Sequence, residues 1–545
     1  MINDYFCNQY KSFIMIKFRL FLILSLLGVL SSYAVNPYLP LWEHIPDGEP
    51  YLFEDPDNPG KYRVYIYGSH DIERSAYCGR NQVVWSADPD SLNNWRFDGV
   101  IFESVSDAAG NLLREDGKGD ILYAPDVAVK NMPDGSKLYY LYPNTQDGKR
   151  SGQIAVSDRP DGPFKVCNWD KSDPQKTYGI LGFDPAVFVD DDGKVYGYWG
   201  FGTSYAAELD PVTMSTVKEG TPVIEGMVSG FKEDGIFNFF EASSIRKIED
   251  KYVFVFSRMS EDGEWGLEPV NYTLAYAYSD NPLGPYTYGG TIIDARGRDT
   301  DATGKTIPTT TPYGNTHGSI LDINGQWYVF YHRQTGLDEF ARQAMVSPIE
   351  VSVEKGPGGR VYISEAELTS EGFELQGLDP FKRYPAGIAS HTTGPGPVVH
   401  KFPNNTYTGP YFESFYLKGK SIEDPYREDI NISRVVNCTD GSIVGYKYFN
   451  FDNMKDIEIP SLKIELIPQG IDGIIDVYTS APWKGNPKPV GTIHINADME
   501  KSPVTLETSL KNLKKERGRT PLYLVFSSPT KNHSIATLEA LQFDR

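Results

Sequence analysis

Cysteine is scarce in this chain, at 4 of 545 residues. Cys7 precedes an apolar N-terminal segment, and Cys78, Cys167 and Cys438 follow it. The three that follow are an odd number, and their spacing is not that of zinc ligands. The sequence therefore indicates neither a disulfide framework nor a structural zinc site.

Basic residues are too few to balance the acids. Lys and Arg number 52 against 73 Asp and Glu, and the net charge is −21. A chain of this charge repels phosphate backbones and anionic lipid headgroups. We therefore expect no nucleic-acid partner. The charge favours a neutral ligand, a metal ion or simple solubility.

The apolar run within residues 15–34 is shorter than the ~20 residues of a membrane-spanning helix. It follows Lys17 and Arg19 and ends in small residues before Val35. This pattern is typical of a secretory signal peptide, with a membrane anchor as the alternative. We expect residues 1–34 to be a signal peptide. The mature protein would then be secreted, periplasmic or on the cell surface, without a membrane span.

Long helical periodicity is absent, whereas turn-forming and aromatic residues are abundant. The chain has 36 Tyr, 51 Gly and 38 Pro. This composition favours many short strands joined by tight turns. A length of 545 residues also exceeds what one core usually fills, so at least two domains are expected.

Two short patterns alternate between residues 50 and 350. One is an apolar strand followed by Ser or Ala, Asp and Pro, as in VVWSADP. The other is a charged turn followed by an aromatic strand, and it occurs five times, ending at Gly68, Pro143, Gly200, Ser257 and Tyr331. Repeats of about sixty to seventy residues with several strands each are typical of propeller blades. We predict an all-β chain with a five-bladed β-propeller over residues 36–375, and a long antiparallel sandwich is the alternative.

The amino-acid composition changes near residue 390, at the segment HTTGPGPVVH, which resembles a linker. Segments such as LKIELIP and TPLYLVFSS are β-patterned, and they predict a β-sandwich (jelly-roll) domain over residues 390–545. A chain ending near residue 380 is therefore expected to fold and to keep whatever activity on small substrates the first domain has.

Three carboxylates lie in short aromatic or glycine-rich settings beside predicted strands: Asp47, Asp184 and Glu241. Strand starts converge on the axis of a propeller, so we predict that these side chains meet. Hydrolysis of a sugar acetal needs a carboxylic acid and a carboxylate whose pKa values are held apart. Phe239 and Phe240 would desolvate Glu241, raise its pKa and make it the acid. Asp47 also fits the simpler role of a turn residue.

Three further residues are candidates for the same centre. Asp126 in YAPDV resembles a fourth inward carboxylate, which would orient substrate or support its blade. His317 in YGNTHGSIL is either a core residue or a support for a hydrated cation, and Arg333 follows the last aromatic strand.

The order of these motifs resembles glycoside hydrolase family 43, whose five-bladed propellers act on arabinose- and xylose-containing polysaccharides. The resemblance spans residues 36–375 and is carried by YIYGSHD, VVWSADPDSLNNW, YAPDV, FDPAVFVDDDG, FFEASS and NTHGSIL. It implies an inverting glycosidase, an α-L-arabinofuranosidase or β-xylosidase. Asp47 would be the general base, Asp184 would tune pKa and orientation, and Glu241 would be the general acid.

The resemblance also implies a hydrated metal, calcium, near His317 and places Arg333 near the sugar hydroxyl groups. In the family the first acid is usually followed by Pro, whereas Gly48 follows Asp47 here. Glu49 and Asp55 therefore stay competitors for the base.

The C-terminal part is similar to a carbohydrate-binding module of family 6, through GYKYFNFDN and TPLYLVF. Its last loop lacks the tryptophan that often forms the sugar platform, so sugar binding and a structural role both stay open. The alternatives for the whole chain are an endo-arabinanase, an exo-galactosidase, a retaining hydrolase and a non-catalytic carbohydrate-binding propeller. We expect a monomer.

Overall fold

The computed structural model describes residues 35–545 except for 74, 234, 308, 311–313, 397, 416–423, 512 and 514–516. The expected signal peptide, residues 1–34, lies outside the described residues. Within them, no helix is long and apolar enough to cross a membrane. The helical turns found there are short 3₁₀ segments: η1 (Glu264–Gly266), η2 (Ala386–Ile388), η3 (Glu428–Ile430) and η4 (Phe451–Met454).

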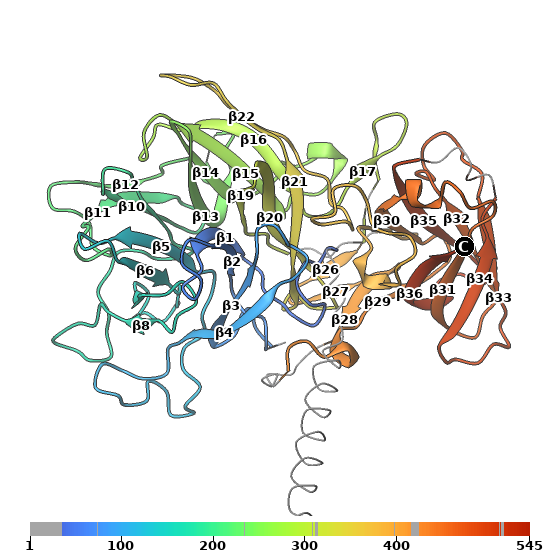
Figure 1. The fold of residues 1–545 in the computed structure, drawn as a ribbon, viewed down its shortest axis with the longest axis horizontal. Helices are drawn as coiled ribbons and strands as arrows, with labels where there is room; N and C mark the ends of the chain where they lie inside the picture. Colours follow the sequence, from blue (N-terminus) through green and yellow to red (C-terminus); the bar gives the residue numbers. More distant parts are fainter. Residues whose placement is uncertain are drawn as a thin grey trace, which may run out of the picture. The chain divides into compact units, whose positions relative to one another are not determined.

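Five antiparallel sheets follow one another along the chain (Figure 1). The first contains β1 (Glu49–Glu54), β2 (Tyr62–Tyr67), β3 (Asn81–Ala87) and β4 (Arg96–Glu103), and the second contains β5 (Asp126–Asn131), β6 (Lys137–Tyr142), β7 (Ala155–Ser157) and β8 (Lys165–Val166). The third contains β9 (Ala186–Val189), β10 (Val195–Trp199), β11 (Tyr205–Leu209) and β12 (Val223–Glu225), and the fourth contains β13 (Phe239–Ile248), β14 (Lys251–Arg258), β15 (Thr273–Ser279) and β16 (Thr287–Asp294). The fifth contains β19 (Ser319–Ile323), β20 (Gln326–Gln334) and β21 (Arg342–Ile349). Two small hairpins follow the fourth and fifth sheets: β17 (Asp299–Thr300) with β18 (Thr306–Ile307), and β22 (Val351–Val353) with β23 (Val361–Ile363).

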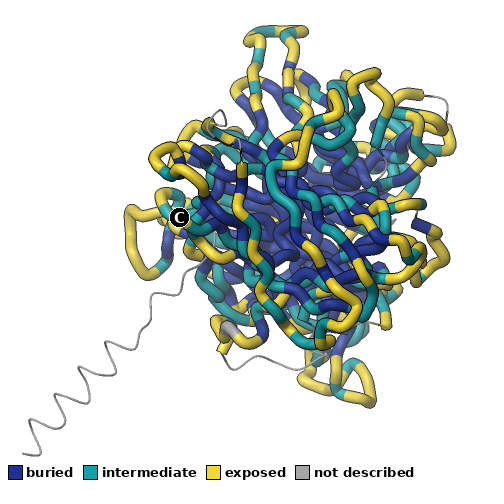
Figure 2. Tube along the Cα trace, turned by 90° about the vertical axis from the view of Figure 1, so that its right-hand side faces the viewer, coloured by how far each residue is buried: buried dark blue, intermediate teal, exposed yellow. Residues whose placement is uncertain are grey.

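The repeated sequence patterns correspond to fixed places in these sheets. The aromatic strands expected after charged turns are β2, β6, β10, β14 and β20, each the second strand of its sheet. Every residue of β10 and of β14 is buried. A strand covered on both faces has a nearly continuous apolar sequence, which explains the pattern. Figure 2 shows the buried residues, in dark blue, gathered in the interior and the exposed ones, in yellow, mainly in the loops at the edge.

The first strands of the five sheets contact one another in a ring. β5 contacts β9, β9 contacts β13, β13 contacts β19, and β19 contacts β1. β1 is joined to β5 by the Tyr51 hydroxyl, which donates to the Asp126 carboxylate over 2.5 Å. Residues at the starts of these strands therefore lie around the middle of the ring, although they are far apart in sequence.

The chain then forms two facing sheets. One contains β25 (His391–Thr393), β30 (Ile443–Asn450), β35 (Arg519–Ser527), β32 (Gly473–Tyr478) and β33 (Gly491–Ile495). The other contains β28 (Tyr411–Ser414), β29 (Ser433–Cys438), β36 (Ala536–Asp544), β31 (Ser461–Pro468), β34 (Val504–Ser509) and β24 (Tyr384–Pro385). In β31 buried and half-buried residues alternate, as expected for a strand with one covered face. Phe449 and Phe543 meet across the two sheets with ring centroids 5.1 Å apart. The all-β fold class with a C-terminal β-sandwich is confirmed.

The C-terminal sheets are bonded tightly to the five-sheet part. The indole N–H of Trp42 donates to the carbonyl of Pro425 over 3.0 Å. The buried ammonium of Lys447 lies 2.9 Å from Glu367 and 3.3 Å from Asp299. These contacts join segments that the sequence analysis treated as separable.

Arg333 is the strongest link between the two parts. Its buried guanidinium donates to the carbonyl of Ala389 over 2.9 Å and also to that of Gly387. It lies over the ring of Phe412 at 4.1 Å. Ile430 of the C-terminal part also belongs to the apolar core that contains Trp42 and Trp85, so the two parts share one packed core, which opposes independent folding of the five sheets.

A chain ending at residue 380 is thus expected to be strongly destabilised. Removing residues 381–545 takes away the Gly387 and Ala389 carbonyls and the Phe412 ring around Arg333, and it takes Ile430 out of the apolar core that contains Trp42 and Trp85. Loss of one large core side chain alone is destabilising by roughly 2–5 kcal/mol. Thermal unfolding of the truncated and full chains checks this. Equal melting temperatures would instead support the expectation that the five-sheet part folds without the C-terminal part.

Candidate active site

A cavity of about 430 Å³ opens where the first strands converge. Asp47, Asp184 and Glu241 all line it, so the predicted convergence of the three acids is present in the structure. The other lining residues include aromatic side chains and several polar ones: Tyr77, Tyr123, Phe183, Phe201, Phe240, Asn315, Glu339, Arg342 and His400. A small concave site with a few convergent polar groups is typical of ligand binding.

The backbone at the three acids is unusual and aims their side chains inward. Asp47 immediately precedes Gly48 and β1 and has φ 59°, while Asp184 precedes β9 and has φ 48°. Glu241 lies in β13, where pairing with β14 is irregular between Phe239 and Ser244. A bulge of this kind redirects side chains, and a positive φ is uncommon for residues other than glycine.

Asp47 is held as a carboxylate. Its Oδ2 accepts a hydrogen bond of 2.5 Å from Ser69, and its Oδ1 lies 3.1 Å from a guanidinium nitrogen of Arg342. Burial alone would raise the pKa of Asp47, but Arg342, the two histidines His332 and His317 and the Ser69 hydrogen bond together outweigh burial and hold the pKa below its usual value. The backbone N–H of Asp47 donates to Nδ1 of His332 over 3.2 Å. Asp47 therefore has the ionisation state of a base.

Glu241 is held in the opposite state. Burial raises its pKa, and the neighbouring Asp184 charge raises it further, to about 8. Only 5% of the residue is exposed. Glu241 is thus protonated at neutral pH, as the sequence analysis expected from its aromatic setting.

Asp184 lies between the acid and the ring of first strands. Its Oδ1 accepts from the side-chain amide of Asn144 over 2.9 Å, and its Oδ2 accepts from the backbone N–H of Ala242 over 3.2 Å. The second contact ties Asp184 to the residue next to Glu241. Burial raises the pKa of Asp184, and the positive charge of His317 opposes that shift.

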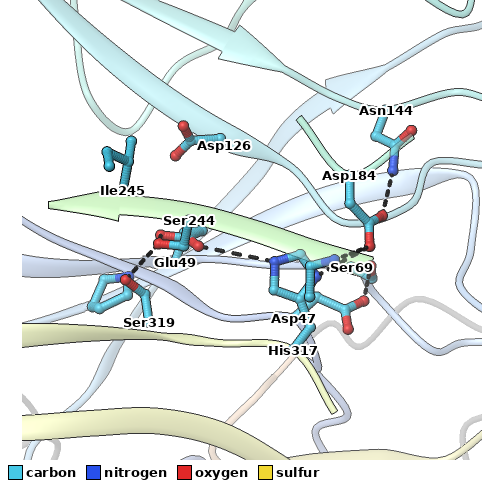
Figure 3. Close-up of polar contacts among 12 residues, drawn as sticks. Asp47, Glu49, Ser69, Asp126, Asn144, Asp184, Ser244, Ile245, His317 and Ser319 are labelled. Carbon is cyan, nitrogen blue, oxygen red and sulfur yellow. Dashed lines mark hydrogen bonds and ion pairs between the residues drawn. The ribbon is translucent and has the colours of Figure 1, made fainter. Parts of the chain in front are cut away.

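His317 lies behind the cavity and does not line it. Figure 3 shows its imidazole between Glu49 on one side and Asp47 with Asp184 on the other. Its Nδ1 is 3.6 Å from Asp184, and its Nε2 is 3.9 Å from Oε1 of Glu49. Burial would lower the pKa of His317, but the hydrogen bond and charge of Asp184, with the charges of Asp47 and Glu49, together outweigh burial and raise the pKa to about 9.

Two buried atoms at this place would face a hydrated cation, whose positive charge would keep the imidazole of His317 neutral. Nε2 of His317 and Oε1 of Glu49 have no hydrogen-bond partner among the described residues. A carboxylate oxygen is a ligand that Ca²⁺ prefers. The part of the chain that the structure describes contains no group of three His, Cys, Asp or Glu side chains placed to hold a metal directly. The residues therefore fit a cation that is bound largely through water.

The competitors for the base lie elsewhere. Glu49 does not line the cavity, and its Oε2 pairs with Arg246 over 2.8 Å. Asp55 lies in the turn after β1, where it accepts from the side chain of Asn58 over 2.9 Å. Of the three candidates, only Asp47 lines the cavity.

Asp126 joins strands and is not part of the cavity wall. One oxygen accepts from Tyr51, and the other accepts from the backbone N–H of Val187 over 2.6 Å. The carboxylate thus connects β1, β5 and β9. Of the two roles considered from the sequence, the structure places Asp126 in the supporting one and brings it into no contact with the cavity.

Arg342, rather than Arg333, is the arginine of the cavity. In the register of β20 and β21, Arg333 pairs with Gln343 and Gln334 pairs with Arg342. Neighbouring pairs along a ladder point to opposite faces, so the two arginines diverge. Arg342 reaches Asp47 and also Asp71, over 2.9 Å. The predicted place of Arg333 beside the sugar is therefore corrected.

Sequence reasoning missed Arg342, Ser69 and Asn315. Arg342 starts a strand after a polar loop, and this signal resembles that of the three acids. Ser69 lies in YIYGSHD, where it follows an aromatic strand. Nothing local distinguishes Asn315, which hydrogen-bonds Glu241, from any turn asparagine.

Known proteins match most of this chain. The family model for glycosyl hydrolases family 43 matches residues 61–355. A xylosidase/arabinosidase of Thermoclostridium stercorarium is 33% identical over 469 residues, which cover 83% of this chain and 88% of that protein. An arabinoxylan arabinofuranohydrolase of Paenibacillus polymyxa is 27% identical, over 71% of this chain and 63% of the relative.

A solved structure covers nearly all of the chain. It is an arabinoxylan arabinofuranohydrolase of Bacillus subtilis in complex with cellotetraose, with 20% identity and a TM-score of 0.43. The alignment covers 95% of this chain and 100% of that one.

Proposed function

Because the chain belongs to glycosyl hydrolase family 43, we propose that it is an inverting glycosidase that removes arabinose or xylose from plant polysaccharides and oligosaccharides. Its five sheets would be the blades of a propeller over residues 36–375. Residues 390–545 would be a domain similar to the carbohydrate-binding modules of family 6. One observation carries the catalytic proposal. Two carboxyl groups of one cavity have pKa values displaced in opposite directions, Asp47 downward and Glu241 upward.

The proposed chemistry uses each acid in its existing state. Glu241 donates its proton to the glycosidic oxygen as the bond to the anomeric carbon breaks. Asp47 takes a proton from a water molecule, whose oxygen bonds to the anomeric carbon from the opposite face. The configuration at the anomeric carbon inverts. Glu241 ends as a carboxylate, and Asp47 ends protonated. Arg342 keeps Asp47 ionised before the reaction, and Asp184 keeps Glu241 protonated.

The direct test is a screen of aryl glycosides followed by proton NMR of the first-formed sugar. We expect release of arabinose or xylose in the anomeric form opposite to that of the substrate. Retention of configuration would contradict the roles of Asp47 and Glu241. No release of any sugar would contradict the proposed activity itself.

Replacing Asp184 by Asn is expected to change the pH profile. The negative charge of Asp184 raises the pKa of Glu241, so its removal lowers that pKa. Glu241 must be protonated to act, and activity is lost as pH rises through its pKa. The alkaline limb of kcat/KM should therefore move to lower pH. Asp192→Asn, in the exposed turn after β9, is the control, and an unmoved or raised limb in Asp184→Asn would contradict this role.

A hydrated calcium ion is proposed beside His317 and Glu49. When bound, it would supply positive charge that stabilises nearby carboxylates and braces the first strands. Chelation is expected to lower both the melting temperature and activity, with recovery on adding Ca²⁺. In Glu49→Gln the chelator should have less effect, because the negative charge that would face the ion is gone. Unchanged stability and activity after chelation of the unaltered protein would exclude the ion.

Location and assembly are proposed from the sequence. Residues 1–34 would direct secretion, and the mature protein would act as a monomer in the periplasm, at the cell surface or outside the cell. Mass spectrometry of the N-terminus and light scattering check these two points.

A further inference from the structure

A hairpin of the C-terminal part reaches the cavity. It consists of β26 (Val399–Lys401) and β27 (Asn404–Thr406), which pair with each other. His400 in β26 lines the same cavity as Asp47 and Glu241. This hairpin follows the five sheets in sequence, so the cavity wall is not made by those sheets alone.

The loop between β20 and β21 holds the hairpin in place. The backbone N–H of Asn405 donates to the carbonyl of Leu337 over 2.7 Å, and that of Glu339 donates to the carbonyl of Pro403 over 3.2 Å. The rings of Phe340 and Phe402 meet edge to face, 6.2 Å apart. The same loop leads directly into Arg342, so the hairpin and the base are supported by one segment.

A continuous row of polar side chains connects His400 with the catalytic carboxylate. Nδ1 of His400 lies 3.2 Å from Oε1 of Glu339 and 3.1 Å from the side-chain oxygen of Asn405. The Tyr77 hydroxyl donates to the other oxygen of Glu339. The ring of Tyr77 lies 4.9 Å from the guanidinium of Arg342. Tyr77 and Glu339 also line the cavity.

The exposure of these groups places them at different depths. The Asp47 and Glu339 side chains are each 5% exposed, whereas that of His400 is 37% exposed. His400 thus lies toward the mouth of the cavity, and the acids lie at its base. A glycosidase that cuts one sugar from a chain holds that sugar at the base and the remaining sugars toward the mouth.

We propose that His400 hydrogen-bonds a hydroxyl group of the sugar on the leaving-group side, and so makes the C-terminal part a determinant of substrate choice. Glu339 and Asn405 hold the imidazole in position for this contact. The inference rests on the proposed glycosidase activity and adds a residue for the aglycone sugar.

The test compares two substrates that share the cleaved sugar: its aryl glycoside and an arabinoxylan-derived oligosaccharide. One hydrogen bond lost in His400→Ala should raise KM for the oligosaccharide about three- to tenfold and leave the aryl glycoside nearly unchanged. His400→Gln, which keeps a hydrogen-bonding group, should lie between. Lys401→Ala, an exposed neighbour in β26 outside the cavity wall, should behave as the unaltered protein.

Two results would overturn the inference: no change in the oligosaccharide KM in His400→Ala, or an equal change for both substrates, which indicates general loosening. Melting temperatures of all variants identify such loosening directly. If the unaltered protein hydrolyses neither substrate, the proposed function fails instead. Calorimetric binding of the oligosaccharide then decides the inference, since weaker binding by His400→Ala than by Lys401→Ala supports it and equal binding overturns it.

Discussion

Glu241→Gln is expected to lose roughly 10²–10⁴-fold in kcat on an oligosaccharide, the usual contribution of a general acid. The amide fills the same buried volume but has no acidic proton for the departing oxygen. An aryl glycoside with an acidic phenol needs less protonation, so its kcat should fall much less. Steady-state kinetics on the two substrates measure this contrast.

The matched control is Glu249→Gln, in the exposed turn at the end of β13. It makes the same chemical change just beyond the same strand, away from the cavity, and should leave both rates unchanged. Equal losses on the two substrates in Glu241→Gln would contradict its role as the acid.

Asp47→Asn is expected to lose roughly 10²–10⁴-fold in kcat on both substrates alike, because a water molecule must be activated whatever group departs. Asn tolerates the left-handed backbone of this position, so the fold should persist. Kinetics with the same substrate pair, together with the melting temperature, separate lost chemistry from lost structure.

Asp55→Asn serves as the control for Asp47→Asn. Asp55 was an alternative base and lies outside the cavity wall, so its variant should stay active. Full activity of Asp47→Asn would assign the base to another residue, and Glu49→Gln would be the next variant to measure.

The sequence was sufficient to predict the strands and the three acids. Second strands covered on both faces carry a repeated aromatic pattern, and Asp47 and Asp184 precede the first strands of their sheets. The aromatic neighbours of Glu241 correctly indicated a raised pKa. These are local signals, which a single sequence contains.

The remaining parts of the site could not be predicted, because they depend on which face of a strand each side chain points to and on contacts between segments far apart in the sequence. Arg333 and Arg342 both lie at one end of the β20–β21 ladder, and only the register shows which one faces Asp47. Asp126 resembles the three cavity acids in sequence, but its oxygens accept from neighbouring strands. His400 comes after the five sheets, and no local pattern connects it with their cavity.

The left-handed backbone at Asp47 and Asp184 has a consequence for selection experiments. Such a conformation is unfavourable by about 1–2 kcal/mol for most residues with a side chain, and glycine avoids the penalty. Asp184 is also a buried carboxyl with a raised pKa, so its replacement relieves a second unfavourable contribution. A library screened for heat resistance alone should therefore enrich glycine or neutral residues at position 184, and the enriched variants should be poorer enzymes.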